Sequence, residues 1–255
     1  MVRCLKRDRL DVKAAKCQGL LLEVTQERAV AKFVVKQGEA TFEARFVSPA
    51  FGLLQPVHEG LHQNMLGQLA THGLRLNDIR FESAPATLAE AHSSYSINTL
   101  GVLVRVWLDR LEISFFDLAR VTQEQILEIA RATLDGVQQT VADLAIDTYT
   151  LALAMHGSFQ DVSLSQFVAQ YVKPAPEALG SVLGSGVVYY LGPEEERRSA
   201  SFVIDVSAVI SDAAFIRTSV ILEGTAVAMA NAVSMVRDAV FKILNAVDIE
   251  INGEG

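Results

Sequence analysis

The sequence predicts an α+β fold in which antiparallel sheets, built from repeated strand–strand–helix units, carry their helices on one side. Two observations support this prediction. Strand-like segments come in pairs before each long helical segment, whereas a parallel sheet needs a helix after nearly every strand. The chain also contains neither a G-x-G-x-x-G turn nor a P-loop, so a parallel nucleotide-binding sheet has no support.

The first unit is predicted to contain a hairpin and a helix. Apolar and polar residues alternate along 41–47, which is the period of a half-buried strand, and 29–36 is its expected partner. Gly38 lies between them, where a tight turn needs a residue that accepts positive φ. A helix should follow over about 53–72, with Gly73 as its C-terminal cap.

The second unit repeats this order. Residues 95–108 and 111–116 are strand-like and should reverse direction between them. Thr122 and Gln125 have the spacing of a capping box, which predicts the start of a helix that keeps apolar periodicity to residue 144.

The third unit follows two intervening elements. Residues 148–155 predict a strand, and Ser163 begins a second capping box that predicts a short helix. Strands are then expected over 200–209 and 215–222, before a helix that follows Gly224.

The domain organisation that follows has two parts. Residues 1–92 form an N-terminal hairpin–helix unit with a basic arm, and 93–255 form two further units joined by a Pro/Gly/Ser-rich loop at 173–186. The alternative is one continuous domain. Residues 194–198 predict a charged hairpin tip or a mobile flap.

The composition indicates a globular, acidic protein. Of 255 residues, 50% are hydrophobic, and the formal net charge is −8. Residues 1–16 hold six basic and two acidic side chains, so the rest of the chain carries all of the net negative charge and is expected to repel duplex nucleic acid. The basic arm is either a solvated tail or a contact for a phosphate or an anionic lipid. No apolar run is long enough to span a bilayer, which predicts a cytoplasmic location, and Cys4 and Cys17 are expected to be free thiols.

One motif in the sequence has the pattern of a catalytic metal site. His58-Glu59-Gly60-Leu61-His62 matches H-E-x-x-H, in which two histidines one helical turn apart bind Zn²⁺ and the glutamate acts as general base on a metal-bound water. Over these five positions the chain resembles the zincin metallopeptidases. The metzincin extension is absent, because Met65 and Gln68 stand where glycine and histidine are required. The alternative is that both histidines border an apolar helix face.

Aromatic residues gather near the second hairpin. Trp107, Phe115 and Phe116, next to Tyr95, are expected to form a cluster on one face of a sheet. An alternative is that they line a groove for an extended peptide, which makes them candidate interaction residues.

The order of elements from residue 95 to 250 resembles a sporadically distributed, uncharacterised bacterial protein family. The segments that carry the resemblance are 104–116, 122–144, 148–155, 164–172 and 202–222. The resemblance implies binding rather than catalysis.

Two functions therefore follow from the sequence. The first is a non-enzymatic bacterial cytoplasmic protein that binds or assembles with a protein or peptide partner, without a cofactor, as a homo-oligomer that uses its sheet edges. The second is a zinc-dependent hydrolase that uses His58, Glu59 and His62.

Overall fold

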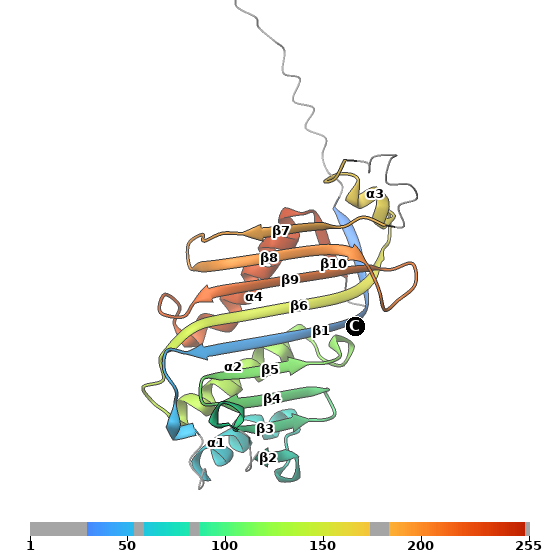
Figure 1. Ribbon diagram of the computed structural model, residues 1–255. Coiled ribbons are helices and arrows are strands. Elements are labelled where there is room, and N and C mark those ends of the chain that lie inside the picture. The colour runs from blue at the N-terminus through green and yellow to red at the C-terminus, as the bar shows by residue number, and fades with distance from the viewer. Residues whose placement is uncertain (1–29, 54–58, 82–86, 174–183, 253–255) are drawn as a thin grey trace, which may run out of the picture.

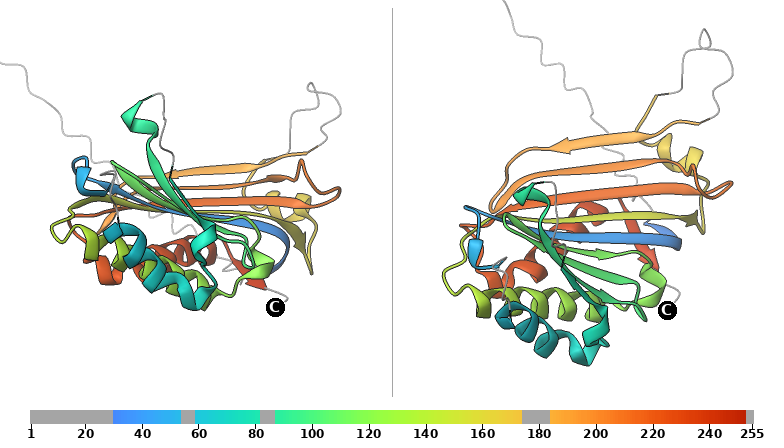
Figure 2. Two further views of the ribbon diagram at one scale, coloured as in Figure 1. Left: turned by 90° about the horizontal axis from the view of Figure 1, so that it is seen from below. Right: turned by 60° about the horizontal axis from the view of Figure 1, so that its bottom comes forward.

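The structure, a computed structural model, describes residues 30–53, 59–81, 87–173 and 184–252. In these residues one ten-stranded sheet carries α-helices on one face (Figures 1 and 2), which confirms the α+β class and the one-sided helix layer. The strands are β1 (Ala31–Phe46), β2 (Ile79–Phe81), β3 (His92–Ile97), β4 (Val102–Trp107), β5 (Arg110–Phe115), β6 (Ile146–Phe159), β7 (Val187–Leu191), β8 (Arg197–Val206), β9 (Ala214–Glu223) and β10 (Ile249–Asn252). The α-helices are α1 (Glu59–Leu69), α2 (Gln123–Thr140), α3 (Leu164–Val168) and α4 (Met229–Ala246).

The two longest strands form the centre of the sheet. β1 and β6 run antiparallel and pair from Phe33 opposite Phe159 to Phe46 opposite Ile146. The full order is β2-β3-β4-β5-β1-β6-β9-β8-β7, and β10 lies beside β1 as the one parallel partner. The sheet therefore contains strands from both sides of residue 92.

The chain is arranged as two similar halves rather than three hairpin–helix units. The order β1, α1, β2 to β5, α2 is followed by β6, α3, β7 to β9, α4. Within the sheet the halves mirror each other, since β5, β4 and β3 extend outward from β1 as β9, β8 and β7 extend from β6. The expectation of three units is wrong because it counts β1 as a hairpin of its own.

The predicted hairpin at Gly38 is a single strand. Gly38 pairs opposite Met155 within β1, and the strand continues without reversal to Phe46. A Cβ at Gly38 would lie 2.9 Å from the Cδ1 of Leu118 and 3.4 Å from the carbonyl oxygen of Ala154. Gly38 therefore lies in close packing with Leu118 within a continuous strand, and not in a turn.

The predicted strand 95–108 is also divided. The chain turns between β3 and β4, where Gly101 has a φ of 64°, and β4 and β5 then form the expected second hairpin. Glycine takes this left-handed conformation without a steric penalty. Because apolar residues alternate with others on both sides of Gly101, the sequence pattern does not indicate the turn between β3 and β4.

Several local predictions are confirmed. The Thr122 hydroxyl accepts a hydrogen bond from the Gln125 amide while the Gln125 side chain accepts one from the Thr122 amide, so α2 has its capping box. Ser163 and Gln166 do the same at α3. Gly73 is left-handed at the end of the turn that follows α1.

The core lies between the sheet and the helix layer. α1 contributes Leu61, Met65 and Leu69, each of which is completely buried. α1 also packs closely on α2, because a Cβ at Gly136 would lie 2.8 Å from the sulfur of Met65. Figure 2 shows α1, α2 and α4 together on one side of the sheet.

Some predicted features lie outside the described residues. These are the basic arm with Cys4 and Cys17, and most of the 173–186 loop. In the part of the chain that is described, no helix combines the length and apolar character needed to cross a membrane.

Candidate functional site

The second histidine of the H-E-x-x-H motif lies on α1 and faces the sheet. The His62 Nδ1 is 3.0 Å from the Tyr95 hydroxyl oxygen on β3, and the two rings lie 5.8 Å apart. Partial burial removes water from the imidazole and lowers the pKa of His62. This hydrogen bond occupies one ring nitrogen and leaves Nε2 for any other partner.

The remainder of the motif is not placed. His58 lies outside the described residues, and only the backbone of Glu59 is described, at the start of α1. Among described side chains, no group of three or more His, Cys, Asp or Glu residues is arranged to hold a metal ion. The zinc site at His58, Glu59 and His62 therefore stays a prediction.

The predicted aromatic cluster is divided between the two faces of the sheet. Trp107 lies on the face away from the helices, where its ring is 5.3 Å from His92 and the Arg110 guanidinium carbon is 4.2 Å from its centroid. Phe115 is completely buried in the core with Tyr95, whereas Phe116 follows the end of β5 and is 55% exposed. The expectation of one aromatic face is wrong because Phe115 pairs opposite Val102, an odd number of residues from Trp107, and successive residues of a strand point to opposite sides of the sheet.

The two edges of the sheet differ in chemistry. One edge is β2, which has three residues and includes Arg80. The other is β7, which has five residues with the sequence VVYYL and no charged or proline side chain. A short or charged edge resists pairing with a second chain, whereas an uncharged apolar edge favours it.

β7 exposes the backbone and side chains that strand pairing needs. Its residues pair with β8 on one side, from Val187 opposite Ile204 to Leu191 opposite Ala200. No described strand pairs with its other side. Val188 is 50% exposed and Tyr190 is 85% exposed, whereas Tyr189 stacks on Phe202 with ring centroids 6.4 Å apart.

Sequence reasoning missed β7. It assigned no element between the 173–186 loop and the 194–198 tip. The signal was present, because two valines and two tyrosines stand between Gly186 and Gly192, and β-branched and aromatic residues bounded by glycines are typical of a strand.

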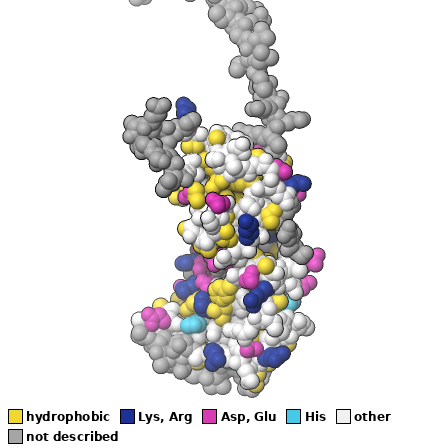
Figure 3. All heavy atoms as spheres, turned by 90° about the vertical axis from the view of Figure 1, so that its right-hand side faces the viewer, with side chains coloured by type: hydrophobic (Ala, Val, Ile, Leu, Met, Phe, Trp, Pro, Cys, Tyr) yellow, Lys and Arg dark blue, Asp and Glu magenta, His cyan; other side chains and the backbone are white. Residues whose placement is uncertain are grey.

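Charged side chains of both signs are interspersed with hydrophobic ones over the surface. Figure 3 shows this on one side of the molecule, where basic and acidic groups lie close together. Some of these charges are paired, as between Arg105 and Glu112 at 3.0 Å.

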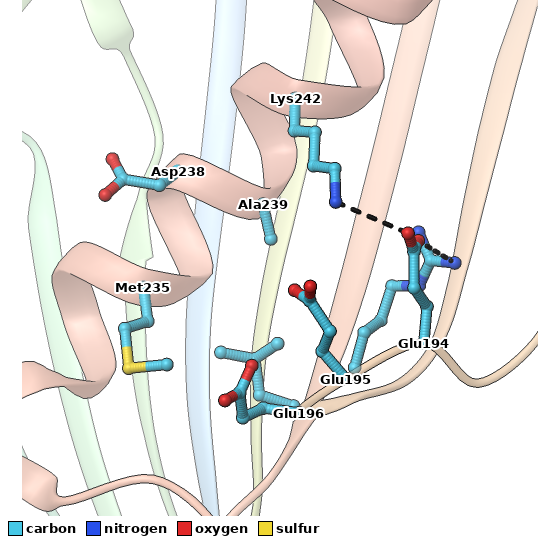
Figure 4. A pocket seen from close by; sticks show the side chains of 9 residues that line it. Glu194, Glu195, Glu196, Met235, Asp238, Ala239 and Lys242 are labelled. Atoms are coloured by element: carbon cyan, nitrogen blue, oxygen red, sulfur yellow. Dashed lines mark hydrogen bonds and ion pairs between the residues drawn. The ribbon is translucent and has the colours of Figure 1, made fainter.

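A hollow of about 250 Å³ lies between the β7–β8 turn and α4 (Figure 4). Glu194, Glu195 and Glu196 line it from the turn, and Lys242 reaches across from α4 to within 3.4 Å of Glu194. Arg197 also pairs with Glu194, at 2.9 Å. These contacts tie the predicted charged tip, residues 194–198, to α4.

The fold and the free edge define the class: an α+β protein with one open sheet, a one-sided helix layer and an uncharged terminal strand. No protein-family model and no curated protein matches the sequence. A similar solved structure is a rolling circle replication initiator protein from Geobacillus stearothermophilus, with 12% identity, 84% of each chain covered and a TM-score of 0.34. A similarity at this level supports no inference about function.

Proposed function

We propose that this chain is a non-enzymatic bacterial cytoplasmic protein that binds protein partners and assembles with itself through the outer edge of β7. The observation that carries the proposal is the chemistry of this edge. β7 ends the sheet, has one partner strand among the described residues, and contains no charge. Because the chain as a whole is acidic, with a net charge of −8, an uncharged edge is where two copies approach with least repulsion.

The edge is complementary to itself. When two β7 strands pair antiparallel around a two-fold axis at Tyr189, Val188 of one copy stands opposite Tyr190 of the other. Val187 and Leu191 stand opposite each other on the helix side. Pairs of aromatic and β-branched residues on neighbouring strands each contribute about 0.2–1 kcal/mol.

The expected association is weak. A stable dimer buries about 1,200–2,000 Å² in total, and five residues of edge supply less than this. We therefore expect a monomer–dimer equilibrium that depends on protein concentration, rather than an obligate dimer.

Multi-angle light scattering over a range of concentrations tests the proposal. The wild-type mass should rise toward twice the monomer as the concentration increases. The double variant Val188→Lys with Tyr190→Lys should remain monomeric, because like charges would face each other across the pair. The matched control is Phe81→Lys on the opposite edge, where the side chain is 39% exposed and the association should persist.

A wild-type protein that stays monomeric at all concentrations would refute the assembly. The same conclusion follows if the double variant dimerises as the wild type does. Far-ultraviolet circular dichroism of each variant establishes that the sheet is intact.

A further inference from the structure

An apolar groove lies between α2 and α4, over the two central strands. It consists of a cavity of about 90 Å³ and a wider one of about 310 Å³, and both are lined by Gln123, Ile126, Leu153 and Phe241. The narrow end reaches Phe42 on β1. The wide end reaches Leu118, Met155 and Ile251.

The groove leaves the middle of the sheet incompletely covered. On β6, Tyr149 and Met155 face the helix layer and are each 1% exposed. Leu151 and Leu153 lie between them on the same face, yet both are only half-buried. Apolar side chains at the centre of a sheet, beneath a helix layer, are ordinarily covered completely, and here the space between α2 and α4 keeps them accessible.

Among the described residues, the lining of the wide end includes a cation and no acid. Lys36 lines it and is exposed, and it has no ion-pair partner among the described residues. Lys36 is the extra residue of a β-bulge, because Val35 pairs opposite Gly157 and Gln37 opposite His156. A bulge of this kind takes a residue out of the strand's alternation, and here Lys36 lines the groove, whereas Gln37 pairs opposite His156 on the face away from the helices.

The groove opens at a break in the sheet. On this side of β1, β10 pairs with Ala31–Val34 and β5 pairs with Ala40–Arg45. The intervening residues, 35–39, pair with neither strand, and the wide cavity lies against Val35, Lys36, Gln37 and Gly38.

The two sides of α4 differ in charge. The hollow in Figure 4 is lined by three glutamates and Asp238, whereas no carboxylate of the described residues lines either part of the groove. Arg237 lines the narrow end but is paired with Asp238, so Lys36 is the described cation left for a ligand. In a chain with a net charge of −8, an apolar groove with Lys36 at one end is complementary to an anion with an apolar body.

We propose that this groove binds a long-chain carboxylate, with the alkyl tail over Leu151 and Leu153 and the carboxylate at Lys36. The eight residues of β1 from Val35 to Phe42 span about 23 Å, at ~3.3 Å for each step from one residue to the next, which accommodates an extended alkyl chain. Lys36 supplies a charge-assisted hydrogen bond, and Gln123, which lines both parts of the groove, supplies an amide donor. The site does not involve β7 and is separate from the proposed assembly.

Calorimetric titration of the purified full chain with octanoate, decanoate and dodecanoate tests whether the groove binds the alkyl tail. Each added methylene is worth about fourfold in affinity when it is fully buried, so the dissociation constant should fall steeply along the series. One saturable site per chain is expected. Absence of saturable binding by dodecanoate, or an affinity independent of chain length, would overturn the proposal.

Two lysines on β1 provide a matched test of the head group. Lys36→Gln should weaken dodecanoate binding about tenfold and leave dodecanol binding unchanged. Lys32→Gln, on an exposed residue of the same strand that does not line the groove, should change neither. Equal losses for both variants, or an equal loss for dodecanol, would show that Lys36 does not bind the carboxylate.

A further variant tests the floor of the groove. Leu153→Glu places a carboxylate beneath the tail and should abolish dodecanoate binding, while circular dichroism reports whether the fold is retained. If the variant folds and binds as the wild type does, the assignment is refuted.

Discussion

The imidazole of His62 and the phenol of Tyr95 share a hydrogen bond of 3.0 Å that joins α1 to β3. Tyr95 is completely buried, and burial raises the pKa of its hydroxyl, which therefore stays protonated. The pair ties the helix of the H-E-x-x-H motif to the outer part of the sheet.

The first prediction concerns pH. Burial lowers the pKa of His62 in the folded chain, whereas an unfolded histidine titrates near ~6.5. The unfolded state thus binds the proton more tightly, and the free energy of unfolding should fall as the pH decreases from ~6.5 through the lowered pKa. Above pH ~6.5, neutral His62 makes its full contribution to the free energy of unfolding.

Urea unfolding of three proteins between pH 5 and pH 8 measures this. In the His62→Gln variant, the free energy of unfolding should fall less steeply below pH ~6.5 than in the wild type. Tyr95→Phe should lose about 1 kcal/mol at every pH and keep the decline, because burial rather than the hydrogen bond lowers the pKa. A His62→Gln profile parallel to the wild type would contradict the assignment.

The second prediction concerns two glycines. A Cβ at Gly157 would lie 2.0 Å from the carbonyl oxygen of Val34, so Gly157→Ala forces β1 and β6 apart and should cost about 3 kcal/mol or more. Gly67, in α1, has no atom within 4 Å of the added Cβ, and Gly67→Ala should stabilise the protein by about 1 kcal/mol. Opposite shifts in thermal midpoint are expected, and shifts of the same sign would contradict the packing described.

The third prediction compares two buried threonines. The Thr218 hydroxyl on β9 has no hydrogen-bond partner in the described part of the chain, whereas the Thr133 hydroxyl donates to the Ile129 carbonyl at 2.7 Å. Thr218→Val removes an unsatisfied hydroxyl and should stabilise the fold by about 1 kcal/mol. Thr133→Val should be neutral or destabilising, and chemical denaturation of the two variants gives the comparison.

The fourth prediction uses the single tryptophan. Trp107 is 8% exposed and lies beneath the Arg110 guanidinium. Arg110→Ala should uncover the indole, shift its emission to longer wavelength and increase its quenching by acrylamide. Arg120→Ala, on a residue with no described contact to the ring, is the control that should leave the emission unchanged.

Local chemistry predicted much of the fold. The capping boxes at Thr122 and Ser163 are complete within four residues, so sequence spacing alone identified the starts of α2 and α3. Gly38 illustrates the limit of such reasoning. Its role depends on Leu118, which is distant in sequence, and a glycine in a polar stretch has the same local pattern whether it turns the chain or permits close packing.

The candidate sites were harder to predict. The sequence around 187–191 identifies a strand, but its position at the edge of the sheet is a property of topology. The groove depends on the spacing between α2 and α4 and on a bulge at Lys36, neither of which has a local signature. Trp107 and Phe115 were grouped by proximity in sequence, although the pairing of β4 with β5 places them on opposite faces.

The pairing of β1 has a consequence for how this protein acquires its structure. Its first residues lie beside β10, at Ala31 and Ile249, and from Phe33 to Phe46 it lies along β6. β1 can pair with β6 and β10 only after these strands have been synthesised. The long chain segments that separate them from β1 lose conformational entropy when the pairs form, and this cost precedes completion of the sheet. During synthesis β1 presents two open edges, so we expect slow, cooperative folding that benefits from a chaperone on the ribosome.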